Sequence, residues 1–346
     1  MSSESRQFVR FLLLKLDPSW RRLPVAERIA QKQEFGSAIQ RFHARMLFRA
    51  YSLVGTRADA DLLFWQVAND LETIQALQTL IFSTGLGSHL GIAYSYLGMN
   101  RRSIYRFPDV PDVDRHIEIK PQDSRYLFLY PFVKTREWYA LPLDRRQGMM
   151  DEHVRIGRQH PDIRLNTISS FGLDDQEFVL AFEADDPADF LALVMELRES
   201  EASRYTLRDT PIFSGIQMSL WEALDSLGAT PATETGTEPA TRRADGLTDV
   251  TAFDELTEGR GKRVYLGAEA IALFKMQDRL FAVSDRCTHG RASLSEGVVD
   301  PASCVLTCPW HGGRFDLATG RPLAGPAMVP VRTFHVTVED GRILVG

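Results

Sequence analysis

The feature that most constrains this 346-residue chain is a pair of short cysteine–histidine motifs near its C-terminal end. The first motif is Cys287-Thr-His289, and the second, after 18 further residues, is Cys308-Pro-Trp-His311. Two cysteines and two histidines in two close pairs predict a site with four metal ligands. Structural zinc is the competing interpretation, but zinc sites usually combine Cys-x2–4-Cys with His-x3–5-His. Here each pair mixes one cysteine with one histidine, so zinc is the less favoured metal.

Mixed pairs suit a Rieske [2Fe–2S] centre, in which one iron binds two thiolates and the other binds two imidazoles. The sequence CPWHGGRFDLATG at 308–320 closely resembles the second ligand loop of Rieske ferredoxins, and SLSEG at 293–297 fits the first. The resemblance covers about residues 247–346 and implies an electron-transfer domain whose four ligands are the residues of the two motifs. Gly312 and Gly313 would let backbone N–H groups approach the sulfur atoms. The remaining cysteine, Cys304, stands in an apolar stretch and is expected to pack as a small hydrophobic residue.

Composition narrows the class of protein further. All three cysteines lie after residue 286, which does not suit a disulfide framework and favours a cytoplasmic protein with reduced thiols. A net charge of −6 gives no reason to expect a nucleic-acid partner. The longest apolar run near the N-terminus, Phe11–Leu14, is far shorter than the ~20 residues of a membrane span. We therefore expect neither a membrane segment nor a signal peptide.

The chain is expected to divide at a segment rich in Thr, Ala, Pro and Gly. This segment, 228–247, has almost no apolar periodicity and is predicted to be a flexible linker with an r.m.s. span of roughly 25 Å. It separates a domain over 1–227 from a second domain over 248–346. The second domain has short alternating or β-branched runs separated by Gly turns, which predicts a small all-β fold.

The first domain alternates strand-like and helix-like segments. The pattern predicts two rounds of strand, helix, strand, strand, helix, strand, which is typical of duplicated ferredoxin-like units with an α+β architecture. Strands are expected at 7–16, 46–54, 61–68, 125–133, 163–171, 177–183 and 212–219, and helices at 24–44, 69–84, 143–160 and 187–199.

His153 is the main candidate for a functional residue in this domain. On the helix over 143–160, Met149, Met150, Ile156 and Gly157 stand three or four positions from it, so His153 lies on the apolar face. A histidine in such a place is more often a satisfied core residue than a ligand. Periodicity alone leaves both interpretations open.

A second resemblance bears on this choice. The segments YPFVK (130–134), EWYALP (137–142) and MDEHVRIGR (150–158) look like the chlorite dismutase family, and most like its coproheme decarboxylase branch. SYLGMNRRSIY (95–105), NTISSF (166–171) and AFEADD (181–186) also fit. The match covers about residues 6–220. It implies two ferredoxin-like repeats, a haem between sheet and helices, and usually a homopentamer.

The resemblance also implies roles for single residues. His153 falls on the proximal haem ligand, and a neutral imidazole is the usual protein ligand in peroxidase-like haem enzymes. Tyr130 falls on the tyrosine that forms a radical beside a haem propionate in the decarboxylases. Lys134 falls on a propionate-binding lysine, and Trp138 falls on a tryptophan near that site. Plain core packing is the alternative interpretation of Tyr130 and Trp138.

The opposite, distal side of the haem is defined by other positions. True chlorite dismutases place an arginine over the iron, and the matching position here is Leu165, flanked by Arg164 and Asn166. Chlorite chemistry is therefore disfavoured. One decarboxylase branch uses a distal histidine, for which His116 is the candidate, although it could equally be an exposed loop residue.

A haem site and a one-electron carrier on one chain suggest electron delivery to iron. The leading hypothesis is a haem-dependent oxidoreductase that uses O2 or peroxide to oxidise a small organic or nitrogenous substrate. It would receive electrons from an external NAD(P)H-dependent reductase through the Rieske cluster. One alternative is a coproheme decarboxylase with an accessory Rieske domain. The other is a non-catalytic haem or redox sensor, or an electron carrier.

Overall fold

The structure is a computed structural model that describes residues 6–43, 45–106, 118–119, 121–122, 124–228, 247–266, 269–276, 279–290, 292–310 and 312–346. The chain divides into two compact units, an N-terminal unit (Met1–Gly228) and a C-terminal unit (Ala229–Gly346). Nearly all of the predicted linker lies outside the described residues. None of the helices in the described ranges is long and apolar enough to cross a membrane.

The N-terminal unit contains two strand–helix–strand–strand–helix–strand repeats, as the sequence pattern predicts. The first comprises β1 (Phe8–Leu16), α1 (Val25–Gln40), β2 (Met46–Ser52), β3 (Leu62–Ala68), α2 (Leu71–Phe82) and β4 (Leu90–Met99). The second comprises β5 (Tyr126–Lys134), α4 (Leu143–Gly157), β6 (Arg164–Ser169), β7 (Phe178–Ala184), α5 (Pro187–Glu199) and β9 (Phe213–Met218). Shorter elements are α3 (Arg136–Ala140), the 3-10 turn η4 (Glu201–Tyr205), β8 (Thr206–Arg208) and α6 (Leu220–Ser226).

The strands of both repeats form one antiparallel sheet in the order β7-β6-β4-β1-β3-β2-β9-β5-β8. A further pairing between β7 and β5 closes the sheet into a barrel, and β8 remains outside the ring. This duplicated ferredoxin-like barrel confirms the α+β prediction.

Both faces of the barrel wall are apolar, which explains the nearly continuous hydrophobic run of β1. Phe11 and Leu13 point into the barrel, where they pack with Trp65. Leu12 and Leu14 point outward into the core under α1, α2 and α6. Because side chains fill the barrel interior, helices and any large ligand must use the outer face.

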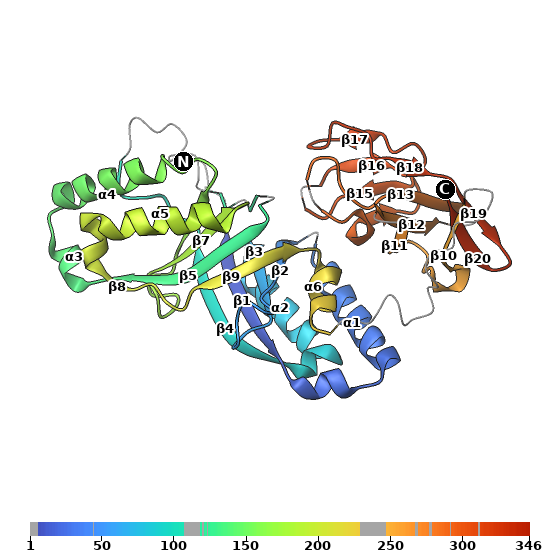
Figure 1. The fold of residues 1–346 in the computed structure, drawn as a ribbon, viewed down its shortest axis with the longest axis horizontal. Coiled ribbons are helices and arrows are strands. Elements are labelled where there is room, and N and C mark those ends of the chain that lie inside the picture. Colours follow the sequence, from blue (N-terminus) through green and yellow to red (C-terminus); the bar gives the residue numbers. More distant parts are fainter. Residues whose placement is uncertain are drawn as a thin grey trace. The chain divides into compact units, whose positions relative to one another are not determined.

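On the second repeat, α5 covers the outer face of β5 and β7, and α4 lies beside α5 (Figure 1). The rings of Phe128 and Phe190 stack with centroids 4.1 Å apart, and Phe182 packs against the same ring. The neighbouring strand β6 is less covered, since Leu165 on its outer face is 37% exposed.

Strand β4 is the element that periodicity does not reveal, although it pairs with β1 along its whole length. Its outward residues are half-exposed, and it contains two glycines, so it lacks the alternation of a half-buried strand. Gly98 is required where β4 meets β6, because a Cβ there would lie 2.5 Å from Ile168 Cγ2 and 2.6 Å from the Ser169 carbonyl oxygen.

The C-terminal unit is all-β in its described residues, which confirms the second part of the fold prediction. One sheet contains β11 (Gly261–Leu266), β12 (Glu269–Met276), β13 (Arg279–Ser284) and β18 (Thr333–Phe334). A second contains β14 (Val298–Asp300), β15 (Val305–Thr307), β16 (Arg314–Asp316) and β17 (Pro322–Ala324). A third contains β10 (Thr248–Ala252), β19 (Val336–Glu339) and β20 (Arg342–Val345). The apolar run 334–338 changes sheets at His335 instead of forming one strand.

One buried carboxyl group, Glu183 on β7, lies inside the barrel wall. It accepts hydrogen bonds from Asn166 Nδ2 and from the Gln122 backbone N–H, each at 2.7 Å. Burial raises the pKa of Glu183 to about 7, against the opposing effect of these bonds and of Arg164 and Arg49. The protonated form is therefore favoured in the folded protein below about pH 7, and ionisation of Glu183 costs stability.

We expect Glu183→Gln to flatten the pH dependence of folding. With the folded pKa above the unfolded one, the stabilisation from Glu183 is present at low pH and is lost as the pH rises through about 7. Between pH 5 and pH 8 the wild-type free energy of unfolding should fall by about 2–3 kcal/mol more than that of the variant. Urea unfolding followed by tryptophan fluorescence measures this, with the exposed Glu199→Gln as control; parallel curves would contradict it.

Candidate functional site

The end of β5 and the short helix α3 bring a lysine and a tryptophan together. Lys134 Nζ donates a 2.7 Å hydrogen bond to the Ala202 carbonyl and lies 4.5 Å from the ring centroid of Trp138. Burial lowers the pKa of Lys134 to about 8, partly opposed by Glu177. The indole face stabilises the ammonium group, which keeps two further N–H donors.

His153 lies on α4, one turn after Met149, which packs with Trp138 and Ala202. Burial, with a smaller effect from the Lys134 ammonium, lowers the pKa of His153 to about 4. The imidazole is therefore neutral at pH 7, and it has no hydrogen-bond partner among the described residues. A neutral, half-buried imidazole without a partner has the donor chemistry that binds a porphyrin iron.

Tyr130 stands on the same strand as Lys134 but in another part of the core. It is buried beside Phe182, with ring centroids 5.8 Å apart and planes 16° from parallel. Burial raises the pKa of its hydroxyl above the ordinary value. The structure therefore groups Tyr130 with the α5 core and groups Trp138 with Met149.

The positions predicted to lie on the distal side have different surroundings. Leu165 pairs with Phe182 across the strands and shares its outward direction. Asn166 pairs with Ala181, points into the barrel and is bound to Glu183. On this strand it is thus Leu165, an apolar residue, that faces outward. His116 lies outside the described residues.

Sequence reasoning missed a carboxylate that supports this region. Glu177 Oε2 accepts a 2.6 Å hydrogen bond from the Tyr139 hydroxyl and a 2.8 Å bond from the Lys134 backbone N–H. It therefore joins β5 to α3 on either side of the turn. Separations of about 40 residues carry no periodic signal, so only the folded structure reveals this link.

In the C-terminal unit, the two motif cysteines are buried and adjacent. The Cys308 thiol and the backbone N–H groups of His289 and Gly290 point at the Cys287 sulfur and lower the pKa of Cys287 to about 6, against the effect of burial. Such a donor set stabilises a thiolate, as metal binding requires. His289 is exposed, and His311 lies outside the described residues.

The glycines and the third cysteine near the motifs have distinct surroundings. Gly312 adopts φ +69°, which favours glycine, and a Cβ on Gly313 would lie 3.3 Å from that of Ala327. Cys304 is half-buried against the core of this unit.

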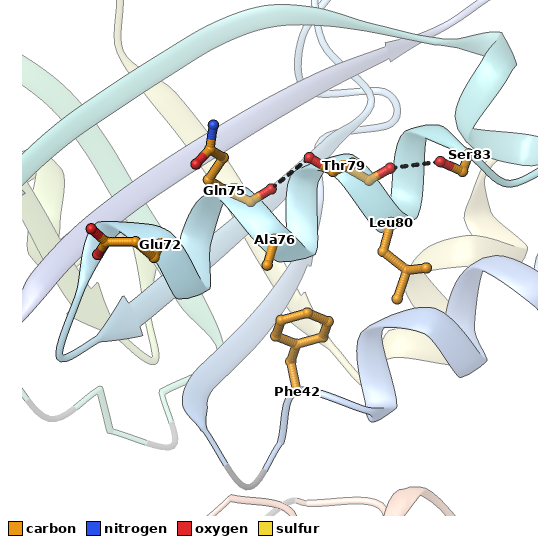
Figure 2. A pocket seen from close by; sticks show the side chains of 7 residues that line it. All are labelled: Phe42, Glu72, Gln75, Ala76, Thr79, Leu80 and Ser83. Atoms are coloured by element: carbon orange, nitrogen blue, oxygen red, sulfur yellow. Dashed lines mark hydrogen bonds between the residues drawn. The ribbon is translucent and has the colours of Figure 1, made fainter.

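A groove of about 500 Å³ elsewhere on the N-terminal unit contains none of the predicted site residues (Figure 2). It runs along the outer face of α2 beside Phe42. The hydroxyl groups of Thr79 and Ser83 donate to carbonyls one turn earlier in the same helix. Both hydroxyl groups are therefore engaged within the helix, and Glu72 and Gln75 are the other polar residues of the lining.

Both units match known protein families. The family model described as chlorite dismutase matches residues 28–218, and that of the Rieske [2Fe-2S] domain matches 247–335. A coproheme decarboxylase from Mycolicibacterium smegmatis is 33% identical over 171 residues, which is 49% of this chain and 72% of that protein. Ferredoxin CarAc from Metapseudomonas resinovorans is 41% identical over 97 residues, which is 28% of this chain and 89% of the ferredoxin.

Solved structures agree with the match of the N-terminal unit. A chlorite dismutase variant from Candidatus Nitrospira defluvii superposes with a TM-score of 0.60 at 26% identity, over 64% of this chain and 95% of that one. The match at 28–218 covers more than half of the 346 residues. The chain therefore belongs to the chlorite dismutase family, a family of haem proteins, and carries in addition a Rieske domain for a [2Fe–2S] cluster.

Proposed function

We propose that this protein is an oxidoreductase in which the Rieske unit supplies electrons to a haem held by His153. The reaction would use O2 or peroxide to oxidise a small organic or nitrogenous substrate. The observation that carries the proposal is the neutral imidazole of His153, without a described partner, in a chain that also pairs the buried thiols of Cys287 and Cys308. An electron carrier on the same chain favours reductive chemistry over a purely peroxide-driven reaction.

The residues of the N-terminal unit have separate tasks in this proposal. When bound, the haem would supply an iron that activates the oxidant. His153 would bind that iron, and the two remaining donors of Lys134 would bind a haem carboxylate. Trp138 supports Lys134 through its ring face. The outward Leu165 offers no charge, so a distal polar group must come from elsewhere, and His116 is our candidate.

In the C-terminal unit, Cys287 and Cys308 would bind one iron of the cluster, and His289 and His311 would bind the other. We infer that an external NAD(P)H-dependent reductase supplies electrons to the cluster. The protein is proposed to be a cytoplasmic homo-oligomer, a pentamer by family resemblance.

His153→Ala should remove most haem binding, because the bond between protein and iron is lost. We expect the Kd, measured by titrating the Soret band, to rise by about a hundredfold or more, equivalent to about 3 kcal/mol. His160→Ala is the matched control, since His160 follows the same helix and pairs with Glu196. Equal haem affinity in the two variants would contradict the assignment of His153 as the haem ligand.

Cys308→Ser should abolish the cluster, whereas Cys304→Ser should retain it. Serine does not replace a thiolate ligand, and Cys304 only packs against the core. Iron content and the EPR spectrum of the reduced protein measure the difference. Iron loss in the Cys304 variant alone would contradict the ligand assignment.

Electron delivery is tested by loading the full chain with haem and then adding NADH and a ferredoxin reductase. Reduction of the cluster should be followed by reduction of the haem and then by O2 consumption. The Cys308→Ser variant, which should lack the cluster, should reduce its haem much more slowly than the wild-type protein. Rapid haem reduction without the cluster would contradict the proposed electron path.

A second candidate, coproheme decarboxylase, is favoured by the similarity to the Mycolicibacterium smegmatis protein and by Tyr130, Lys134 and Trp138. Incubation with iron coproporphyrin III and peroxide separates the two candidates. Loss of two carboxylates, detected by mass spectrometry and abolished in Tyr130→Phe, supports the decarboxylase. Unchanged porphyrin with the wild-type protein supports our proposal.

A further inference from the structure

The first ligand loop of the C-terminal unit is fastened at both ends by one buried carboxylate, that of Asp285. The loop leaves β13 at Asp285 and returns at Ser293 and Ser295. Asp285 Oδ2 accepts a 2.7 Å hydrogen bond from the Ser293 hydroxyl, and Oδ1 accepts a 2.6 Å bond from the Ser295 backbone N–H. The Asp285 carbonyl accepts a third bond, from the Leu294 N–H, at 2.7 Å.

Strand β11 also binds the Asp285 carboxylate, through Arg263. Arg263 Nε donates a 2.6 Å hydrogen bond to Asp285 Oδ2, with the carboxylate almost fully buried and the guanidinium largely so. Gly261 on this strand leaves room only for hydrogen, because a Cβ would lie 2.3 Å from the Ser295 carbonyl oxygen. The end of the loop is therefore fixed between β11 and Asp285.

The ligand residues depend on this attachment. Between the two fixed ends, the Cys287 N–H donates to the Ala292 carbonyl at 2.9 Å, which closes the loop on itself. The N–H groups of His289 and Gly290 then point at the Cys287 sulfur. A displacement of Ser293 or Ser295 would move this whole turn relative to Cys308.

We propose that Asp285 is the positioning residue of the first ligand loop and that its ion pair with Arg263 sets the reduction potential of the cluster. The potential of an iron–sulfur cluster responds to nearby net charge and to hydrogen bonds on its sulfur atoms. A buried carboxylate favours the oxidised, more positive cluster, and a buried guanidinium favours the reduced one. The pair balances these opposite effects two residues from a cluster ligand.

The test is potentiometry on the full-length protein with its cluster, using two variants that change the charge in opposite directions. Asp285→Asn keeps the shape and removes the negative charge, so the ratio of reduced to oxidised cluster at a fixed potential should rise by about tenfold or less. Arg263→Gln removes the positive charge, so the same ratio should fall. A purely structural role would not produce opposite shifts.

Asp249→Asn is the matched control, because Asp249 forms an ion pair with Arg342 in the same unit but away from the ligand loops. It should leave the potential and the EPR g values unchanged, while Asp285→Asn should change both. If Asp285→Asn assembles no cluster, the positioning role is supported and the Arg263→Gln shift decides the electrostatic role. Wild-type potentials and g values in both Asp285→Asn and Arg263→Gln would overturn the proposal.

Discussion

Closure of the duplicated sheet is the constraint on which the rest of the N-terminal unit depends. The pairing of β5 with β7 makes a continuous ring, and the inward side chains of Phe11, Trp65 and Phe213 fill it. A porphyrin therefore cannot enter the barrel. Only the space between the outer face and the helices is available to it, which agrees with the exposed Leu165 on β6.

The charge states of Lys134 and His153 in this outer layer follow from their burial away from water. Burial lowers the pKa of Lys134 to about 8, which is still above neutral pH, and that of His153 to about 4, which is below it. The lysine stays mainly protonated because the Ala202 carbonyl and the Trp138 ring replace water around the ammonium group. The imidazole has no such partner among the described residues and stays neutral. A charged donor and a neutral imidazole therefore lie close together, since the Lys134 ammonium helps to lower the pKa of His153.

The sequence predicted the features that depend on residues close together along the chain. The Rieske domain could be predicted because the motifs at Cys287 and Cys308 are short and characteristic, and the family match over 247–335 confirms the domain. Long strands such as β1 are also visible, because burial on both faces makes them continuously apolar. His153 is different, since its helix face alone did not separate a ligand from a core residue.

The sequence did not predict features that depend on contacts between residues far apart along the chain. Glu177 and Glu183 look like ordinary charged residues at the ends of β7, yet both accept hydrogen bonds from distant elements. Strand β4 was hidden because β1 and β6, rather than its own alternation, determine it.

In the C-terminal unit, the proposed electron transfer requires a cluster that a partner can approach and whose sulfur atoms are shielded from water. Cys287 and Cys308 are buried, whereas His289 is exposed. In the proposed electron path, the side of the exposed His289 would be the one open to solvent and to a redox partner. As a proposed ligand on the exposed side, His289 needs a rigid loop beneath it, because small displacements would alter the N–H groups directed at the Cys287 sulfur. The buried attachment of the loop through Asp285 supplies that rigidity without covering the exposed side.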